Sequence, residues 1–478
     1  MHEVLNLSLS QRANHLTTHF YNAQESYLDY SVSSTESPND TNVYFKPTLA
    51  ANNTINFNPR ALIWDLNGGF GSLGQFEYVS KGEVSEDSSP AQFQTSIISK
   101  PRIPKAQYQK SLDNGEVLPK LDKSNTHYWS DYSRVIYEPK SFNVLSKWEF
   151  DPIEYPRGRL SFGQEREFMG YDLGLEEWKD LGIEFLENKY RIMLEECDLI
   201  NGINLVTEID SAWGGFGSGL LNELRDDYNP KSSIFQWGLF NNKSISQLSN
   251  KEILSRIKTF LELSKNSSLF IPLGLPKFRQ FDQENMWESS SLQNLVFETV
   301  QVLNSQRENR STFHQFESAL TIGDKRNLIT KVAATIGSET IEFSQNFFKP
   351  FYPRKPQKVQ SDYTFSKSII KRPSQSSVSL ADLSVSASTH DRTTSEYKTS
   401  LSFPTPDSYP QDIISSSDSL NVTLDIDSSA RRLLLDMKSF VSKFVKGDER
   451  SDIIDELSEL AAEYEHGWND SDESDDDY

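Results

Sequence analysis

The chain has 478 residues, of which 36% are hydrophobic and 12% aromatic, so it holds enough apolar material for two or three folded domains and is not wholly disordered. Its single cysteine, Cys197, excludes a disulfide framework and a cysteine-based zinc site. The formal net charge of −21 excludes a protein that coats nucleic acid, because phosphate groups would repel it, and no apolar run approaches the roughly 18 residues of a membrane span.

The first quarter of the chain predicts strands and helices interrupted by loops. An alternating pattern at 4–9 predicts an opening strand, and a helix follows at 14–25. Ser, Thr, Asn and Pro residues at 33–56 predict a loop, whereas the apolar run 61–66 predicts a buried strand. Residues 77–125 show little periodicity, so we predict a long, partly disordered insertion there.

The middle of the chain has the order of elements found in nucleotide-type domains. Apolar residues recur with a helical period at 175–196, and an alternating strand follows at 203–210. The glycine-rich stretch 213–219 then predicts a loop that leads into another helix at 220–228. Helix, strand, glycine loop and helix in this order indicate an α/β domain.

The last part of the chain predicts a second α/β unit and a helical end. Helices are predicted at 248–264 and 293–305, with a strand between them at 267–276. A Ser/Thr/Pro-rich region follows at 355–420, and its residues 378–385 alternate like a strand. Amphipathic helices at 433–444 and 453–464 precede a solvated acidic tail at 468–478. We therefore predict a nucleotide-type domain at 1–245, a second α/β domain at 246–430, C-terminal helices at 431–467 and a tail at 468–478.

Two segments share the pentapeptide Gly-Gly-Phe-Gly-Ser, at 68–72 and at 214–218, and both follow a predicted strand. Glycines there allow a positive φ and bring backbone N–H groups close to an anion, and the second segment also opens a helix. A pair of tight turns without a ligand is the other interpretation.

Gly69, Gly71 and Gly74 also match the dinucleotide fingerprint. The residues after them are predicted to form a poor helix, which weakens the interpretation as an oxidoreductase.

Four blocks of sequence, in order, resemble the tubulin superfamily. MHEVLNLSLSQRANHLTTHFYN is similar to the opening of tubulins, PRALIWDL (59–66) to a tubulin strand, CDLINGINL (197–205) to the stretch before the signature loop, and WGGFGSG (213–219) to that loop. Within the superfamily, HYWSDYSRVIYEPKS (127–141) and DIIDELSELAAEYE (452–465) resemble the Misato family. The resemblance implies an α/β tubulin/FtsZ-like fold: a Rossmann-like nucleotide-type domain, a second α/β domain and C-terminal helices.

The Misato resemblance also implies a function and a place in the cell. The family acts in mitochondrial organisation, in partitioning of the organelle and in inheritance of mitochondrial DNA. We therefore expect a protein of the cytoplasm and of the cytosolic face of the mitochondrial outer membrane, and Glu3 without a basic region argues against a targeting peptide. Expected partners are proteins of the mitochondrial outer surface, the cytoskeleton or the chaperones. Peripheral membrane association is compatible with this expectation, and direct binding of nucleic acid is not expected.

By residue-for-residue resemblance, the nucleotide-binding positions would be Gln11, Asn14, Asp65, Gly214, Gly215, Gly217, Ser218 and Gly219. Several tubulin features are replaced: Ser10 stands for a glycine, Phe216 for a threonine and Asn67 for an acid near the magnesium. We therefore expect neither a catalytic residue nor a metal, and no cofactor, with GTP or GDP as the alternative. The favoured function is non-catalytic, and the alternatives are a GTP-binding or GTP-hydrolysing assembly protein and a dinucleotide oxidoreductase.

A few other residues have chemistry worth following. His15 and His19 are one helical turn apart, a spacing that could hold zinc, but without a third ligand we interpret them as an ordinary histidine pair. Glu298, Glu308 and Glu317 are interpreted as surface glutamates of helices. The tail at 468–478 holds six acidic residues, which could attract a basic partner or simply keep the chain soluble.

Overall fold

The computed structural model describes residues 2–28, 37–49, 53–75, 103–161, 166–241, 247–349, 362–375, 393–415, 417–447 and 449–467, together with Lys243, Phe351, Thr389 and His390. Three sequence predictions lie outside the described residues: most of the proposed insertion, at 77–102, the alternation at 378–385, and the acidic tail at 468–478.

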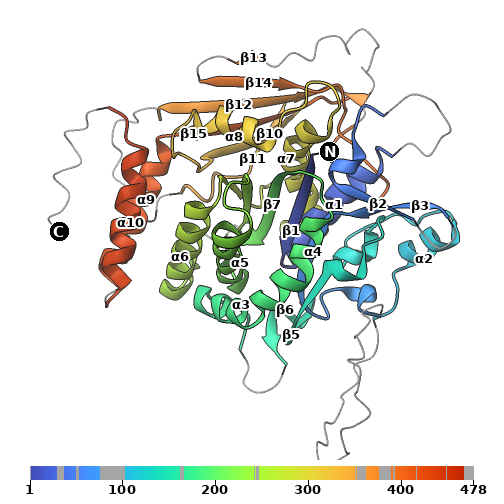
Figure 1. Cartoon of the computed structure of the whole chain (residues 1–478), viewed down its shortest axis with the longest axis horizontal. Helices are drawn as coiled ribbons and strands as arrows, with labels where there is room; N and C mark the ends of the chain where they lie inside the picture. Colours follow the sequence, from blue (N-terminus) through green and yellow to red (C-terminus); the bar gives the residue numbers. More distant parts are fainter. Residues whose placement is uncertain are drawn as a thin grey trace, which may run out of the picture.

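A seven-stranded sheet forms the centre of the molecule (Figure 1). Its strands, in spatial order, are β6 (Tyr155–Leu160), β5 (Phe142–Asp151), β4 (Ala61–Asn67), β1 (Glu3–Leu9), β7 (Ile200–Glu208), β8 (Ile234–Leu239) and β9 (Leu269–Leu273). All neighbours are parallel except β5 and β6. The central strands β1, β4 and β7 are almost entirely buried, polar residues included, because helices cover both faces of the sheet.

Helices cover the two faces of this sheet. α3 (Tyr171–Phe185), α5 (Ala212–Glu223) and α6 (Asn250–Asn266) pack side by side, and α1 (Gln11–Glu25) packs along α7 (Met286–Ser305) (Figure 1). A π-helical turn, Leu186–Tyr190, joins α3 to α4 (Arg191–Glu195), so the helix predicted at 175–196 is confirmed. The strands predicted at 4–9, 61–66, 203–210 and 267–276 are confirmed as well.

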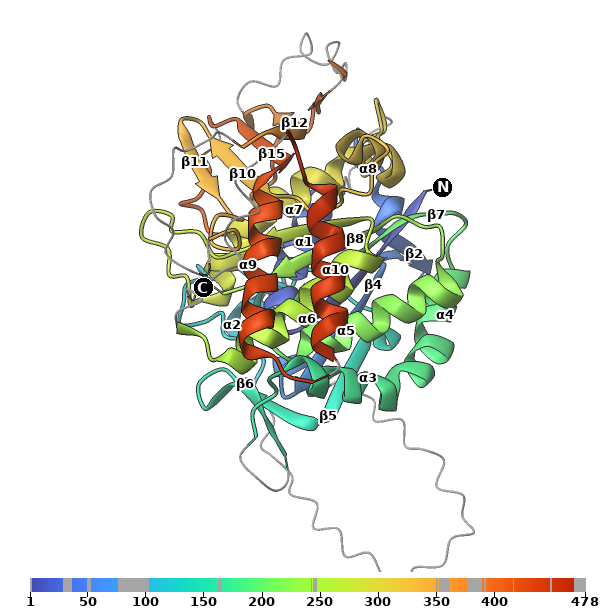
Figure 2. The same cartoon turned by 90° about the vertical axis from the view of Figure 1, so that its left-hand side faces the viewer.

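A six-stranded mixed sheet forms a second layer, and α7 lies against it. In spatial order it contains β11 (Glu339–Glu342), β10 (Lys331–Ile336), β15 (Leu420–Asp427), β12 (Thr364–Arg372), β14 (Thr394–Lys398) and β13 (Thr389–His390). α8 (Phe313–Thr321) packs on this sheet. α9 (Ser429–Phe444) and α10 (Glu449–Glu463) form the predicted helical pair and lie side by side over α6 (Figure 2). The predicted α/β fold class with C-terminal helices is therefore confirmed.

Two segments differ from the sequence prediction. The segment 33–56 was predicted as a loop, but its described part contains a 3₁₀ turn (Thr41–Val43) and most of a hairpin, β2 (Phe45–Leu49) with β3 (Ile55–Pro59). Within the proposed insertion, the described residues 103–125 are folded and contain α2 (Gln107–Asn114). The apolar residues of this stretch build a small core with Tyr132 and Trp287, which explains why it is ordered.

Candidate functional site

The candidate site lies at the carboxyl ends of β1 and β4. It is next to the point between β1 and β7 where the strand order reverses, and α/β sheets usually bind ligands at such a point. Ser10 follows β1 with φ 114°, a conformation that favours glycine. Its hydroxyl accepts a hydrogen bond from the N–H of Ala13 at 3.2 Å and so caps α1. The serine thus keeps a glycine-like backbone at some cost in strain and gains a helix cap.

Asp65, near the end of β4, is the centre of a buried polar network. Its Oδ2 accepts hydrogen bonds from Gln11 Nε2 and Asn14 Nδ2, both at 2.8 Å. Its Oδ1 accepts from the backbone N–H of Leu66 at 2.8 Å. Three residues that the sequence placed in one nucleotide site, Gln11, Asn14 and Asp65, are therefore in direct contact.

Trp129 completes this network and covers it. It lies in a 3₁₀ turn, Trp129–Tyr132, and its indole Nε1 donates to Asp65 Oδ2 at 3.1 Å. The rings of Phe70 and Phe142 pack against the indole, with centroids 5.8 and 6.2 Å away. Trp129 and Asp65 are both fully buried, so an apolar cover of aromatic rings lies next to the carboxylate.

The environment of Asp65 determines its charge. Burial raises the pKa of Asp65 to about 7, although hydrogen bonds from Asn14, Leu66, Trp129 and Gln11 oppose that rise. Oδ2 already accepts three hydrogen bonds from N–H groups of the chain and Oδ1 accepts one, so a magnesium ion would compete with these donors. The carboxylate is therefore poorly suited to hold a divalent cation.

The first glycine segment, 68–72, forms a real turn. Gly68 and Gly71 have φ of 90° and 54°, and a Cβ at Gly69 would overlap the side chains of Asp65 and Gln11. The N–H groups of Gly69 and Gly71 donate to Leu66 and Gly68 within the turn, so they do not point at an anion. The residues Gly71–Gln75, which include two of the three fingerprint glycines, form a 3₁₀ turn, whereas a dinucleotide fingerprint opens an α-helix there.

The second glycine segment was predicted as a loop, and this prediction is wrong. Residues 214–219 are helical and form the first turns of α5, which begins at Ala212. Every residue from Ala212 to Leu221 is buried. The N–H of Ala212 donates to the carbonyl of Phe168 at 3.3 Å, so the first amide of the helix is already engaged by the chain.

The glycines of α5 are explained by close packing. A Cβ at Gly215 would overlap the carbonyl oxygen of Tyr171 on α3, and a Cβ at Gly174 of α3 would overlap that of Ala212. Gly214 faces Thr259 of α6 and Gly219 faces the ring of Trp178. Small residues on both helices let the backbones of α3 and α5 approach closely, which helps to fix how they pack.

Gly217 and the two side chains next to it have different surroundings. A Cβ at Gly217 would lie 3.3 Å from Leu9 Cδ1, a tight contact that a shift of the leucine side chain by a few tenths of an ångström would relieve. Ser218 Oγ donates to the carbonyl of Gly214 at 2.9 Å inside the helix. Phe216 packs against Trp64 and Trp178 with ring centroids 5.0 and 5.1 Å apart. The two halves of the predicted site are therefore joined by aromatic packing, and not by a shared set of polar groups.

Comparison with known proteins identifies the family. Residues 2–114 match the Misato Segment II tubulin-like domain, and residues 118–306 match a Tubulin domain. The chain is 30% identical over 497 aligned positions to Protein DML1 of Yarrowia lipolytica, with 100% of both chains covered. It is 31% identical to Protein DML1 of Kluyveromyces lactis, with 99% of both covered, and 42% identical over 282 residues to that of Debaryomyces hansenii, with 58% of both covered. The chain belongs to the Misato/DML1 family of tubulin-like proteins.

In this Misato/DML1 chain, two predicted features outside the strand-end site are buried. His15 Nδ1 lies 2.8 Å from the hydroxyl of Tyr132, and His19 Nε2 lies 2.9 Å from the carbonyl of Trp287. Burial lowers the pKa of His15 and lowers that of His19 to about 3, so both rings are neutral at physiological pH. Among the described residues no group of three metal-binding side chains comes together, and none of the described helices could cross a membrane.

Two buried residues with central polar contacts were missed or misread from the sequence. Trp129 was noted only as part of a family-like segment, and nothing in its local sequence signals contact with Asp65, 64 positions away. Glu298 was interpreted as a surface glutamate, but it is fully buried in α7. Glu308 is exposed as predicted, but it lies in a bend between α7 and α8 and not in a helix. Glu317 lies in α8, is half-buried and accepts a hydrogen bond from Ser233. Burial raises the pKa of the Cys197 thiol to about 11, which does not favour a nucleophile.

Proposed function

We propose that this chain is a non-catalytic tubulin-like protein that acts in mitochondrial organisation, including partitioning of the organelle and inheritance of mitochondrial DNA. It works on the cytosolic face of the mitochondrial outer membrane and in the cytoplasm, through protein partners of the outer surface, the cytoskeleton or the chaperones. Membership in the Misato/DML1 family over the whole length supports the mitochondrial part of this proposal.

The contact between Trp129 and Asp65 carries the non-catalytic part. A nucleotide-hydrolysing site needs phosphate clamps, a metal and a positioned water together. Here the carboxylate is buried under an indole and hydrogen-bonded by the chain, and the glycines of α5 pack against neighbouring helices. These observations favour a fold that retains the layout of a nucleotide site without its chemistry.

Depletion of the protein from fungal cells tests the cellular claim. We expect collapsed or unevenly distributed mitochondria and daughter cells that lack mitochondrial DNA, with both defects reversed by re-expression of the intact chain. Normal networks and normal retention of mitochondrial DNA would contradict the proposal.

An Asp65→Asn chain separates the non-catalytic reading from the GTPase alternative in the same cells. If the carboxylate has no catalytic role, this variant restores the mitochondria whenever its abundance matches that of the intact chain. Failure of an equally abundant, folded variant would favour the GTPase alternative, and immunoblots with thermal melting in lysates provide the required control.

A further inference from the structure

α7 lies in the interior, between the helical cover of the first sheet and the second sheet. It contacts α1 on one side and β10, β12 and β15 on the other. Every residue from Trp287 to Ser305 is buried, although many of them are polar. Apolar packing alone fixes the position of such a helix along its axis less strictly than paired buried charges do.

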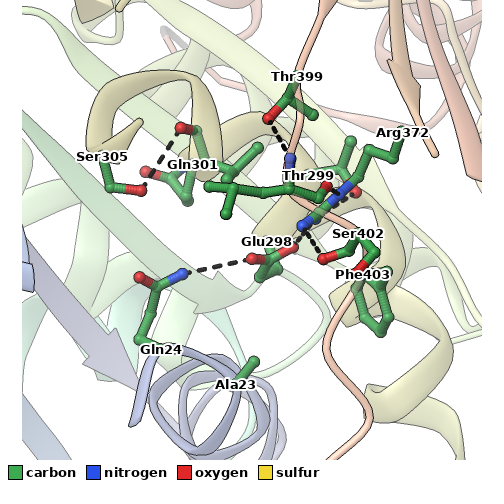
Figure 3. A network of polar contacts seen from close by, with 12 residues as sticks. Ala23, Gln24, Glu298, Thr299, Gln301, Ser305, Arg372, Thr399, Ser402 and Phe403 are labelled. Carbon is green, nitrogen blue, oxygen red and sulfur yellow. Dashed lines mark hydrogen bonds and ion pairs between the residues drawn. The ribbon is translucent and has the colours of Figure 1, made fainter. Parts of the chain in front are cut away.

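Arg372, the last residue of β12, reaches α7 from the second sheet (Figure 3). It is almost fully buried, and its guanidinium has five N–H groups, each of which has an acceptor. The acceptors are Leu401 O for Nε at 3.0 Å, Glu298 Oε2 and Thr299 Oγ1 for Nη1, and Tyr27 OH and Ser402 O for Nη2 at 2.7 and 2.8 Å. The charge is thus fully compensated without water.

Glu298 is the matching acid on α7, and both members of the pair have no exposed side-chain surface. Its Oε1 accepts hydrogen bonds from Tyr27 OH at 2.9 Å and from Gln24 Nε2 at 3.3 Å. Gln24 belongs to α1, and Tyr27 follows it by three residues. The Tyr27 hydroxyl donates to Glu298 and accepts from Arg372, so it bridges both charges.

The network therefore ties together four segments that are far apart in sequence: the end of α1, the middle of α7, the end of β12, and the stretch 399–403 that follows β14 (Figure 3). Each of the four segments contributes a buried polar group that finds its hydrogen-bond partners only in this arrangement. Moving α7 by one helical turn, about 5.4 Å, would leave a carboxylate and a guanidinium unpaired in the interior. Breaking a buried pair in this way is strongly unfavourable.

We propose that the Glu298–Arg372 network is a register lock: it holds α7 in one axial position against α1 and the second sheet, so that the two layers move as one body. A ligand or partner at the strand ends of the first sheet cannot then shift α7 unless its binding outweighs the loss of the whole network. This inference is independent of the proposed function, because it concerns how the layers are coupled and not what the strand ends bind.

Three variants and a surface control test the lock by thermal melting. Arg372→Met and Glu298→Leu alone should each lower the melting temperature by roughly 5–10 °C, because each leaves one buried charge without its partner. The double variant should recover at least half of that loss. Asp180→Asn, which removes an exposed partner of Lys147, should leave the melting temperature unchanged.

Hydrogen exchange then separates a lock from ordinary packing. In the double variant, amides at 295–303 and at 399–403 should exchange at least tenfold faster than in the intact chain, although the melting temperature is largely restored. Unchanged exchange there would overturn the proposal, and so would single variants without effect or a double variant no more stable than the singles.

The intact chain provides a measurement that needs no variant. A lock requires that amides at 295–303 and at 399–403 open together, so their exchange should report the same free energy of opening. If the stretch 399–403 exchanges far more easily than α7, the two are not locked, and the proposal fails even where every variant is unfolded.

Discussion

The indole Nε1 of Trp129 donates a hydrogen bond to Asp65 Oδ2 at 3.1 Å, and neither side chain has exposed surface. The carboxylate at the end of β4 is thereby closed off by a residue from a different part of the chain. Because Gln11 and Asn14 bind the same oxygen, Asp65 Oδ2 accepts three hydrogen bonds from the protein itself, whereas the buried Oε1 of Gln11 has no partner among the described residues. The first prediction concerns what happens when this cover is removed.

Two substitutions of Trp129 should lower the free energy of unfolding by different amounts. Trp129→Phe keeps most of the ring packing but removes one donor to a buried carboxylate, which should cost about 1–2 kcal/mol. Trp129→Ala also leaves a large cavity and should cost about 3–5 kcal/mol. Urea unfolding measures both, and indole added to the alanine variant should raise its midpoint but not that of the intact chain.

Trp178→Phe is the matched control for the loss of an indole donor. Trp178 is also buried and donates to a carboxylate, that of Glu223 at 2.8 Å, but Glu223 is only half-buried. Water can replace the lost donor there, so we expect a smaller cost, below about 1 kcal/mol. Equal costs for the two Trp→Phe variants would argue against a special role for Trp129.

The raised pKa of Asp65 predicts a distinctive dependence of stability on pH. The carboxyl binds a proton more tightly in the folded state, with a pKa of about 7, than in the unfolded state. The stabilisation that comes from this tighter proton binding is therefore fully present in the free energy of unfolding below about pH 4, and it is lost as the pH rises through 7. The free-energy difference between the intact chain and Asp65→Asn should change by up to about 1.4 kcal/mol per pH unit in this window. Urea unfolding at pH 5, 6, 7 and 8 measures it, and a constant difference would show that Asp65 ionises normally.

His19 should give the opposite dependence of stability on pH to that of Asp65. Burial lowers its pKa to about 3 in the folded state, so its contribution is present above pH 6.5 and is lost as the pH falls toward 3. The groups around it are the rings of Tyr132 and Tyr409, the carbonyl of Trp287, and His15 one turn away, and none of them is an acid that would hold a proton on the ring. The unfolding free energy of His19→Gln should therefore fall less steeply between pH 6.5 and 4.5 than that of the intact chain. Parallel curves would contradict the buried, neutral state.

The glycines of α3 and α5 provide a test that distinguishes packing from phosphate binding. Gly174→Ala and Gly215→Ala each place a methyl group on a backbone carbonyl oxygen of the neighbouring helix and should cost several kcal/mol, about 3 or more. Gly217→Ala is the matched control, because its methyl group would meet only side chains at 3.3 Å or beyond, and alanine favours a helix by about 1 kcal/mol over glycine. Thermal melting of the three variants should give this order. If Gly217→Ala is the most harmful of the three, packing does not explain the motif.

The sequence predicted the elements whose hydrophobic pattern is strong. The opening strand, the apolar strand before Asn67 and the two amphipathic C-terminal helices are found where the pattern placed them. The hairpin at Phe45–Pro59 was missed because Ser, Thr, Asn and Pro dominate its neighbourhood, although Phe45 and Pro59 pair directly. Glycine has a low helix propensity, so 214–219 were predicted as a loop, whereas packing against α3 favours residues without a side chain in a helix.

The candidate site was predicted only in part, for a related reason. Gln11 and Asn14 lie in the first turn of α1, which follows β1 directly, and Asp65 lies near the end of the neighbouring strand β4, so resemblance could bring them together. Trp129 and Arg372 reach their partners, Asp65 and Glu298, across 64 and 74 positions of sequence, and no local pattern carries that information. Pairing at such distances depends on the packed fold, which is why Glu298 was placed on the surface.

Quantifying the nucleotide released from the gently purified and then denatured full-length chain tests the central claim most directly. We predict less than about 0.1 guanine nucleotide per chain and no uptake when GTP and magnesium are added to the folded protein, because Asp65 is occupied by donors of the chain and the glycines of α5 are packed against its neighbours. Near-stoichiometric GDP or GTP in the folded sample would contradict this account and favour a working nucleotide site.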